Sequence, residues 1–196
     1  MKIVNRRRVM GKGLPYDAEI EYLESTGTQF IDTGLKLCSG IYNNFRIETK
    51  IKSCAKVDAT LLAVILACVL EKGPFHGFII RYDGKRVALV YNKTGMTPMG
   101  EFDSIIEINH FFDNISQHDI PTTLYAGYDG NGNVYRYSKV TIYYLKIYGN
   151  EELIADFIPV RIGQVGYMYD KVSKQLFGNS GTGEFILGPD VTSGNS

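Results

Sequence analysis

Residues 163–185 read GQVGYMYDKVSKQLFGNSGTGEF, and this stretch decides the predicted fold. Gly178, Gly181 and Gly183 lie close together in it and predict chain reversals. Phe177, Phe185 and the following Ile186 are predicted to point into a core. The stretch has no catalytic spacing and no cluster of metal ligands, so it predicts the closing strands of a β-domain.

The composition agrees with a single β-rich domain. The chain has 196 residues, 44% of them hydrophobic, which is enough apolar material for one core. It contains 14 Tyr and 10 Phe but no Trp, and its 21 Gly supply turns. Aromatic and β-branched residues favour pleated, half-buried surfaces, so few long helices are expected.

The first fifteen residues are predicted to be a flexible basic arm. The formal net charge of the chain is zero, yet this arm concentrates positive charge and has no acid before Asp17. Its cationic residues are Lys2, Arg6, Arg7, Arg8 and Lys12. Such an arm binds nucleic acid or an acidic protein surface and becomes ordered there, or it is simply a solvated terminus. No apolar segment of a secretory signal follows it.

The longest apolar run, Leu61–Leu70, is too short to span a membrane as a helix, which takes about 20 residues. It predicts a buried strand with a bulge, and no membrane insertion. Cys38, Cys54 and Cys68 are odd in number and lack C-x-x-C spacing, which predicts reduced, mostly buried thiols.

Three segments have strand patterns. In residues 45–52, Phe45, Ile47, Thr49 and Ile51 alternate with charged residues, which predicts a strand with one wet face. Residues 139–148 are β-branched or aromatic on both faces, as in a central strand. Residues 153–162 continue the pattern, but Pro159 predicts an edge or a bulge there.

Residues 78–91 predict a hairpin with a two-residue turn at Asp83-Gly84. This register places Arg81 directly opposite Arg86. If both guanidinium groups share a face with Lys50 or Lys52 from a neighbouring strand, they would bind an anionic partner; alternatively the two side chains extend into water.

The pattern of residues 104–116 fits two structures. Ser104 and Glu107 have capping-box spacing before apolar residues at helical intervals. A strand with Ile106, Ile108 and Phe112 inward fits equally well. No internal repeat is present, and residues 192–196 are predicted to be a disordered tail.

Two phrases carry a family resemblance: EYLESTGTQFIDTG at residues 21–34 and IADFIPVRIGQVGYMYDKVSKQLFGNSGTGEFILGPD at residues 154–190. They resemble concanavalin A-like (laminin G-like) jelly-roll domains that are common in phages of gut bacteria and in bacterial surface proteins. The resemblance implies an antiparallel β-sandwich over residues 16–191, in which the two phrases form one shared region. Six glycines of the phrases are expected at chain reversals: Gly27, Gly34, Gly166, Gly178, Gly181 and Gly183.

The resemblance also implies a function. It points to a non-catalytic structural component of a phage virion (head fibre, decoration or tail-associated protein) that attaches to the host surface. The arm would anchor it to other virion subunits on the particle exterior, and the protein would be a homo-oligomer with host-surface glycan as a partner. The alternative is a lectin-like carbohydrate-binding module at a bacterial surface.

Two sequence patterns raise chemical alternatives. Asp17, Glu19 and Glu21 share one face of an extended segment, as catalytic carboxylates do in glucanases of this fold. Their order of Asp and Glu differs from the glucanase order, however, and they lie before or at the start of the phrase at residues 21–34. A solvated edge is expected there, and no enzyme activity.

Asp129, Asn131 and Asn133 present oxygen ligands at alternate positions, as in a calcium loop, but the glycine and glutamate of an EF-hand are missing. A plain hairpin loop without a cofactor is expected, and a Ca²⁺ ion at a loop rim is the alternative. The three histidines, His76, His110 and His118, are scattered and predict no catalytic site.

Overall fold

The computed structural model describes residues 13–53, 63–70, 76–82, 86–91, 97–101, 103–113, 117, 119–128 and 133–191, and at residues 53, 63–91 and 128 it describes the backbone alone. All regular elements in these residues are strands, and their pairs run antiparallel. The predicted all-β, antiparallel class is therefore confirmed, and the arrangement is consistent with a β-sandwich.

The larger sheet has nine strands. Six of these strands are hydrogen-bonded to one another in the order β16 (Gln175–Phe177), β15 (Val165–Asp170), β14 (Glu152–Ile162), β13 (Val140–Gly149), β2 (Leu23–Glu24) and β17 (Ile186–Leu187). The other three strands pair outside this order: β4 (Asn44–Ser53) pairs with β13, β9 (Ile105–Asp113) with β4, and β1 (Ala18–Glu19) with β14.

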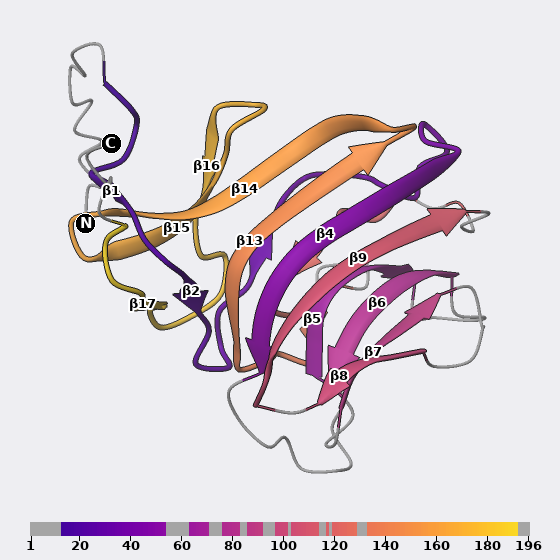
Figure 1. The fold of residues 1–196 in the computed structure, drawn as a ribbon, viewed down its shortest axis with the longest axis horizontal. Coiled ribbons are helices and arrows are strands. Elements are labelled where there is room, and N and C mark those ends of the chain that lie inside the picture. Colours follow the sequence, from indigo (N-terminus) through magenta and orange to yellow (C-terminus); the bar gives the residue numbers. More distant parts are fainter. Residues whose placement is uncertain are drawn as a thin grey trace.

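The second sheet has six strands, in the order β3 (Ile31–Asp32), β10 (Thr123–Leu124), β5 (Ala63–Leu70), β6 (His76–Tyr82), β7 (Arg86–Tyr91) and β8 (Thr97–Glu101). A small sheet joins β11 (Gly127–Tyr128) to β12 (Val134–Tyr135). Figure 1 shows the long strands β14, β13, β4 and β9 as one curved layer, with β5 to β8 in a second layer beside it.

The core lies against the inner face of β4, as the alternation predicted. Phe45, Ile47, Thr49 and Ile51 are all buried. The ring of Phe45 stacks on that of Phe112 from β9, with 4.8 Å between their centroids. Residues of the six-stranded sheet, such as Leu124, belong to the same hydrophobic cluster, so one core joins this sheet to the nine-stranded one.

Residues 105–113 form a strand, not a helix. They pair with β4 along its whole length, from Ile105 opposite Lys52 to Asp113 opposite Asn44. Burial alternates, with Ile106, Ile108 and Phe112 inward. The capping-box spacing at Ser104 was therefore misleading, because the period-two burial of the apolar residues outweighs it.

Of the edge or bulge predicted for residues 153–162, the edge is wrong, but β14 does contain a bulge: its pairing with β13 shifts at Ile154, away from Pro159. β14 pairs with β15 without a register shift, and on its other side it pairs first with β13 and then with β1. The carbonyl of Pro159 accepts from Ile20 N–H, so the missing N–H of the proline faces the end of the two-residue strand β1. The pairing of β14 with β1 therefore loses few hydrogen bonds at this position, which is why an interior strand tolerates the proline.

The opening and closing phrases lie side by side, as the resemblance implied. Ser180 N–H donates to Phe30 C=O, and Thr182 N–H donates to Thr28 C=O. The buried amide of Gln29 binds both phrases, because its Oε1 accepts from Thr26 N–H and its Nε2 donates to Glu184 C=O. The two phrases therefore encode one hydrogen-bonded region.

Two details of these phrases differ from expectation. Gly166 is not at a reversal but inside β15, where a Cβ atom would lie 2.3 Å from a methyl carbon of Leu23. Ile186 is 46% exposed, whereas Phe185 is buried. Both differences arise because the strands of this region pack closely and alternate between inward and outward residues.

The β6–β7 hairpin has a different register from the predicted one. Arg81 pairs with Ala88 and Tyr82 with Val87, so the loop is longer than a two-residue turn and Arg81 does not face Arg86. The two registers differ by two residues, which is one period of a strand, so apolar pairs such as Ile80 with Leu89 remain. The hydrophobic pattern alone therefore could not distinguish the two registers.

The apolar run near residue 65 forms β5, with a register shift between Val64 and Leu66, so the predicted strand with a bulge is confirmed. The Cys38 side chain is buried, as expected; Cys54 lies outside the described residues. In the part of the chain that the structure describes, no helix is long and apolar enough to cross a membrane.

Candidate ligand groove

A β-bulge in β13 creates the most distinctive surface of the larger sheet. The pairing of β13 with β4 shifts between Ile142 and Tyr144, which leaves Tyr143 as the extra residue. Tyr143 and Tyr144 are both half-buried, between the buried Ile142 and Leu145. Bulges bend strands and redirect side chains, and this one turns two consecutive tyrosines toward the outer face.

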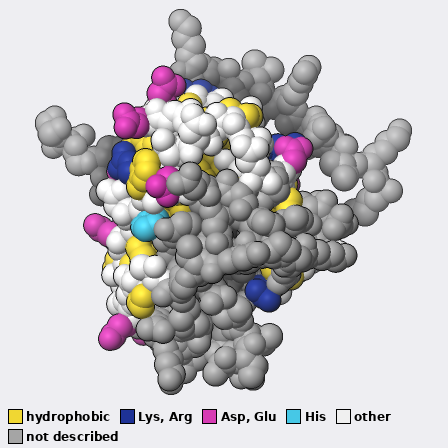
Figure 2. Space-filling model, turned by 90° about the vertical axis from the view of Figure 1, so that its right-hand side faces the viewer, with side chains coloured by type: hydrophobic (Ala, Val, Ile, Leu, Met, Phe, Trp, Pro, Cys, Tyr) yellow, Lys and Arg dark blue, Asp and Glu magenta, His cyan; other side chains and the backbone are white. Residues whose placement is uncertain are grey.

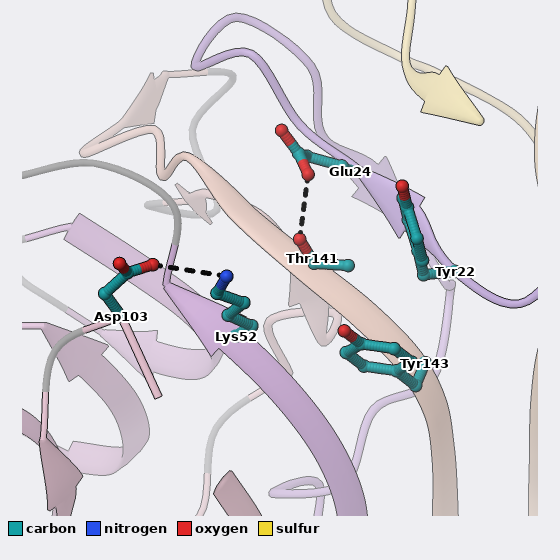
Figure 3. Close-up of a pocket in the computed structure, with 6 residues that line it drawn as sticks. All are labelled: Tyr22, Glu24, Lys52, Asp103, Thr141 and Tyr143. Carbon is teal, nitrogen blue, oxygen red and sulfur yellow. Dashed lines mark hydrogen bonds and ion pairs between the residues drawn. The ribbon is translucent and has the colours of Figure 1, made fainter. Parts of the chain in front are cut away.

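A depression of about 430 Å³ lies on one side of Tyr143 (Figure 3). It is lined by Tyr22, Glu24, Lys52, Asp103, Thr141 and Tyr143. Figure 3 shows Tyr22 and Glu24 on one side, Lys52 and Asp103 on the other, and the two β13 residues between them. The depression therefore combines aromatic rings with hydrogen-bonding groups, as sites for polar ligands do.

Contacts within the depression fix its side chains. Thr141 Oγ1 donates to Glu24 Oε2 at 3.0 Å, and Lys52 Nζ lies 3.3 Å from Asp103 Oδ1. The rings of Tyr22 and Tyr143 meet edge to face with 5.7 Å between their centroids. These contacts hold the lining in place before any ligand arrives.

A second depression, of about 330 Å³, lies on the other side of Tyr143. Tyr143 and Tyr144, the apolar Ile20, Ile158, Pro159 and Val191, and the charged Glu19, Glu21, Lys50 and Glu107 line it. Because Tyr143 belongs to both depressions, we name the two together the tyrosine groove. It crosses the larger sheet from the loop before β9 to the β1 segment.

Neighbouring charges act on the tyrosines of the groove. Burial first, and then the carboxylates of Glu107 and Glu48, raise the pKa of Tyr144 above its ordinary value. Its phenol therefore stays protonated and can donate a hydrogen bond. Lys50 Nζ lies 5.0 Å from the ring centroid of Tyr143, a cation–π contact.

The core supports the bulge from below. Thr49 is buried in β4, and its hydroxyl donates to Tyr144 C=O at 2.6 Å. This side-chain bond gives Tyr144 C=O a donor from the core, next to the bulge. Thr49 therefore helps to position the tyrosines without lying in the groove.

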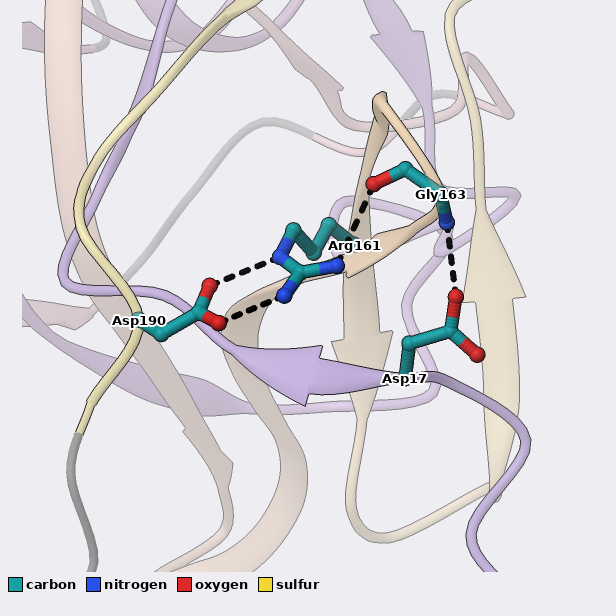
Figure 4. A network of polar contacts seen from close by, with 4 residues as sticks. All are labelled: Asp17, Arg161, Gly163 and Asp190. Carbon is teal, nitrogen blue, oxygen red and sulfur yellow. Dashed lines mark hydrogen bonds and ion pairs between the residues drawn. The ribbon is translucent and has the colours of Figure 1, made fainter.

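The three acidic residues near the start of the chain are divided by the fold. Glu19 and Glu21 line the groove, whereas Asp17 Oδ2 accepts from Gly163 N–H at 2.7 Å in a separate network (Figure 4). In that network, Arg161 Nε and Nη2 donate to the two carboxylate oxygens of Asp190. Asp17 thus holds the β14–β15 turn in place.

The strands around Arg81 and Arg86 are arranged differently from the prediction. Arg81 and Arg86 belong to the six-stranded sheet, whereas Lys50 and Lys52 belong to β4 of the other sheet and line the groove. Arg86 pairs in register with Glu101 of β8, so a carboxylate-bearing residue lies opposite it. Lys50 and Lys52 therefore do not come from strands next to Arg81 and Arg86.

Other predicted site residues fall outside the described part of the chain. These are Lys2, Arg6, Arg7, Arg8 and Lys12 of the arm, and Asp129 and Asn131 of the loop; Asn133 alone is described, just before β12. Among the described residues, no group of three or more His, Cys, Asp or Glu side chains could hold a metal ion.

Figure 2 shows the side of the molecule that is on the right in Figure 1. On its coloured part, acidic and basic side chains are interspersed with hydrophobic ones, without a large patch of one charge.

Comparison with family models, curated proteins and solved structures finds no match to this chain.

Sequence reasoning missed the tyrosine groove. It identified residues 139–148 as a central strand, but the bulge at Tyr143 depends on how β13 pairs with β4. Two consecutive tyrosines in a strand, Tyr143 and Tyr144, were the only local signal. Tyr22 and Asp103 reach the groove through tertiary packing, which no local pattern encodes.

Proposed function

We propose that this chain is a non-catalytic attachment domain that binds glycan through the tyrosine groove. The observation that carries the proposal is the groove itself, in which tyrosines, carboxylates, a threonine hydroxyl and lysines surround an open depression. Sugars present apolar ring faces and many hydroxyl groups, so aromatic rings beside charged hydrogen-bonding groups match them chemically.

We further propose that the domain is a jelly roll carried on the exterior of a phage virion, as a head fibre, decoration or tail-associated protein. The resemblance of residues 21–34 and 154–190 supports this proposal. The basic arm, residues 1–15, would anchor the domain to other virion subunits, and a homo-oligomer would increase avidity for host-surface glycan. A lectin-like module at a bacterial surface would use the same groove and is the second candidate.

Binding to immobilised oligosaccharides tests the groove. We expect the wild-type protein to bind, and Tyr143→Ala to lose about tenfold or more in affinity, because it removes the ring shared by both depressions. Tyr137→Ala is the matched control, since Tyr137 is exposed and lies outside the groove. Equal binding by wild type and Tyr143→Ala would refute the groove as the site.

Co-sedimentation distinguishes the two settings. If the domain is a virion component, the full-length protein should sediment with phage particles. A chain beginning at Tyr16 should then remain in the supernatant while still binding glycan. Light scattering should then show a discrete oligomer for the full-length protein. A full-length monomer that binds glycan but no particle would instead support the surface module.

A further inference from the structure

The tyrosine groove has an excess of negative charge. Its charged lining consists of five carboxylates, from Glu19, Glu21, Glu24, Asp103 and Glu107, and two ammonium groups, from Lys50 and Lys52. This composition leaves three net negative charges in a chain whose formal net charge is zero. The groove is therefore more acidic than the molecule as a whole, and its field attracts cations.

Three of these carboxylates already have side-chain partners. The ion pair between Lys52 and Asp103 accounts for one carboxylate, and Thr141 donates to Glu24. Tyr16 Oη donates to Glu19 Oε1 at 2.8 Å. Glu21 and Glu107 remain, both exposed, and Glu21 has no side-chain partner among the described residues.

The protein itself shows what kind of group fits beside these carboxylates. The Lys50 ammonium lies over the ring of Tyr143, and Lys50 pairs in register with Glu107 on β9. An ammonium group thus finds an aromatic face and a nearby carboxylate in the second depression. A ligand ammonium near Glu21 would meet the same two types of group, because Tyr143, Tyr144 and Glu21 line one depression.

We propose that the tyrosine groove selects glycan chains that carry protonated amino groups and disfavours polyanionic chains. This inference rests on the proposed glycan-binding function and adds the chemical class of the ligand. Glu21 and Glu107 are the selecting residues, because their carboxylates are exposed to the second depression. Tyr143 contributes to the affinity for any sugar, whatever its charge.

Titration calorimetry with three hexasaccharides tests the selection at about pH 6. The probes are a glucosamine hexamer with free amino groups, a neutral glucose hexamer and a heparin hexasaccharide. The test variant is Glu21→Gln/Glu107→Gln. Its matched control is Glu152→Gln/Glu184→Gln, which makes the same charge change at two exposed residues outside the groove.

We expect the glucosamine hexamer to bind best, and the test variant to lose about five- to tenfold in affinity for it. Affinity for the neutral hexamer should change by less than about twofold, and the control variant should match wild type. Added salt should weaken binding of the amino probe most, because screening reduces charge attraction. A melting curve confirms that each variant is folded.

The contrary outcomes separate the two proposals. If heparin binds best and Tyr143→Ala abolishes that binding, the charge selection is refuted and the glycan-binding function stands. If the test variant binds the amino probe as tightly as wild type, the assignment of Glu21 and Glu107 is refuted. If no hexasaccharide binds, the proposed function fails, and this inference fails with it.

Discussion

Individual residues join the two ends of the chain through backbone contact. Gly181 shows this most clearly, because a Cβ atom built on it would lie 2.3 Å from the carbonyl oxygen of Thr28. The neighbouring Asn179 Oδ1 accepts from both Gly181 N–H and Phe30 N–H. The glycine at 181 is therefore required by close approach of two backbone segments.

Gly181→Ala should lower the free energy of unfolding by about 1–3 kcal/mol, because the fixed backbone of Thr28 cannot move away from the methyl group. Gly178→Ala is the matched control, since its nearest neighbour is the ring of Tyr167 at 3.2 Å, which can adjust. Urea denaturation of both variants measures the difference. Equal stability of the two would contradict the backbone contact.

Asp170 is a buried carboxylate at the turn between β15 and β16. It accepts hydrogen bonds from the N–H groups of Asp156, Val172 and Ser173. Burial alone would raise the pKa of Asp170, but these hydrogen bonds and a side-chain bond from Ser173 together hold it below its usual value. The ionised carboxylate thus stabilises the folded state.

Because the pKa of Asp170 is lower in the folded state, its contribution to stability is complete above its unfolded pKa, about 3.9, and is lost as the pH falls through the folded pKa. Asp170→Asn should therefore cost about 2 kcal/mol at neutral pH and progressively less below pH 4. Unfolding free energies of both proteins from pH 7 to pH 2 test this. A difference independent of pH would exclude the carboxylate charge as its cause.

At the scale of elements, the β13 bulge links the core to the groove. Thr49 makes this link, since its hydroxyl binds Tyr144 C=O from the buried side of the sheet. Thr49→Val keeps the shape but leaves that carbonyl without this donor. We expect it to lower the free energy of unfolding by about 1 kcal/mol and to speed amide exchange at residues 142–145.

Thr123→Val is the control for Thr49→Val. Thr123 is also buried and donates to a backbone carbonyl, that of Ala126, but it lies in the other sheet. Exchange at residues 142–145 should stay as in wild type in this control. If both variants change exchange there equally, Thr49 has no specific effect on the bulge.

The strands show which features of the fold could be predicted from the sequence alone. Alternation predicted which residues of β4 are buried, because one face of that strand contacts the core and the other contacts water. It left residues 104–116 undecided, since short apolar patterns fit both periods, and only the pairing of β9 with β4 separates them. The β6–β7 register and the bulge at Tyr143 depend on partner strands, so no local pattern could predict the groove.

At the scale of the whole molecule, both ends of the described chain meet at one place. Val191 N–H donates to Glu19 C=O, and Glu21 N–H donates to Pro189 C=O. Arg161 reinforces this junction through its two bonds to Asp190 (Figure 4). The pairing raises the pKa of Arg161, so the guanidinium stays charged at any pH of interest.

Arg161→Ala should leave global stability almost unchanged, because partly exposed ion pairs contribute little. It should instead loosen the ends locally, so that amide exchange speeds up at residues 18–21 and 186–191. Arg136→Ala, a change of an exposed arginine elsewhere, should leave these amides unaffected. Unchanged exchange in Arg161→Ala would show that the backbone bonds alone close the junction.

The junction of Glu19 with Val191 has a practical consequence. A domain whose entry and exit points are neighbours can be spliced into a surface loop of an unrelated carrier protein without stretching either chain. The same proximity allows a circular permutant, with a short linker across the junction and new termini at the exposed turn between β13 and β14. Such a graft would present the tyrosine groove on any scaffold that tolerates a loop insertion.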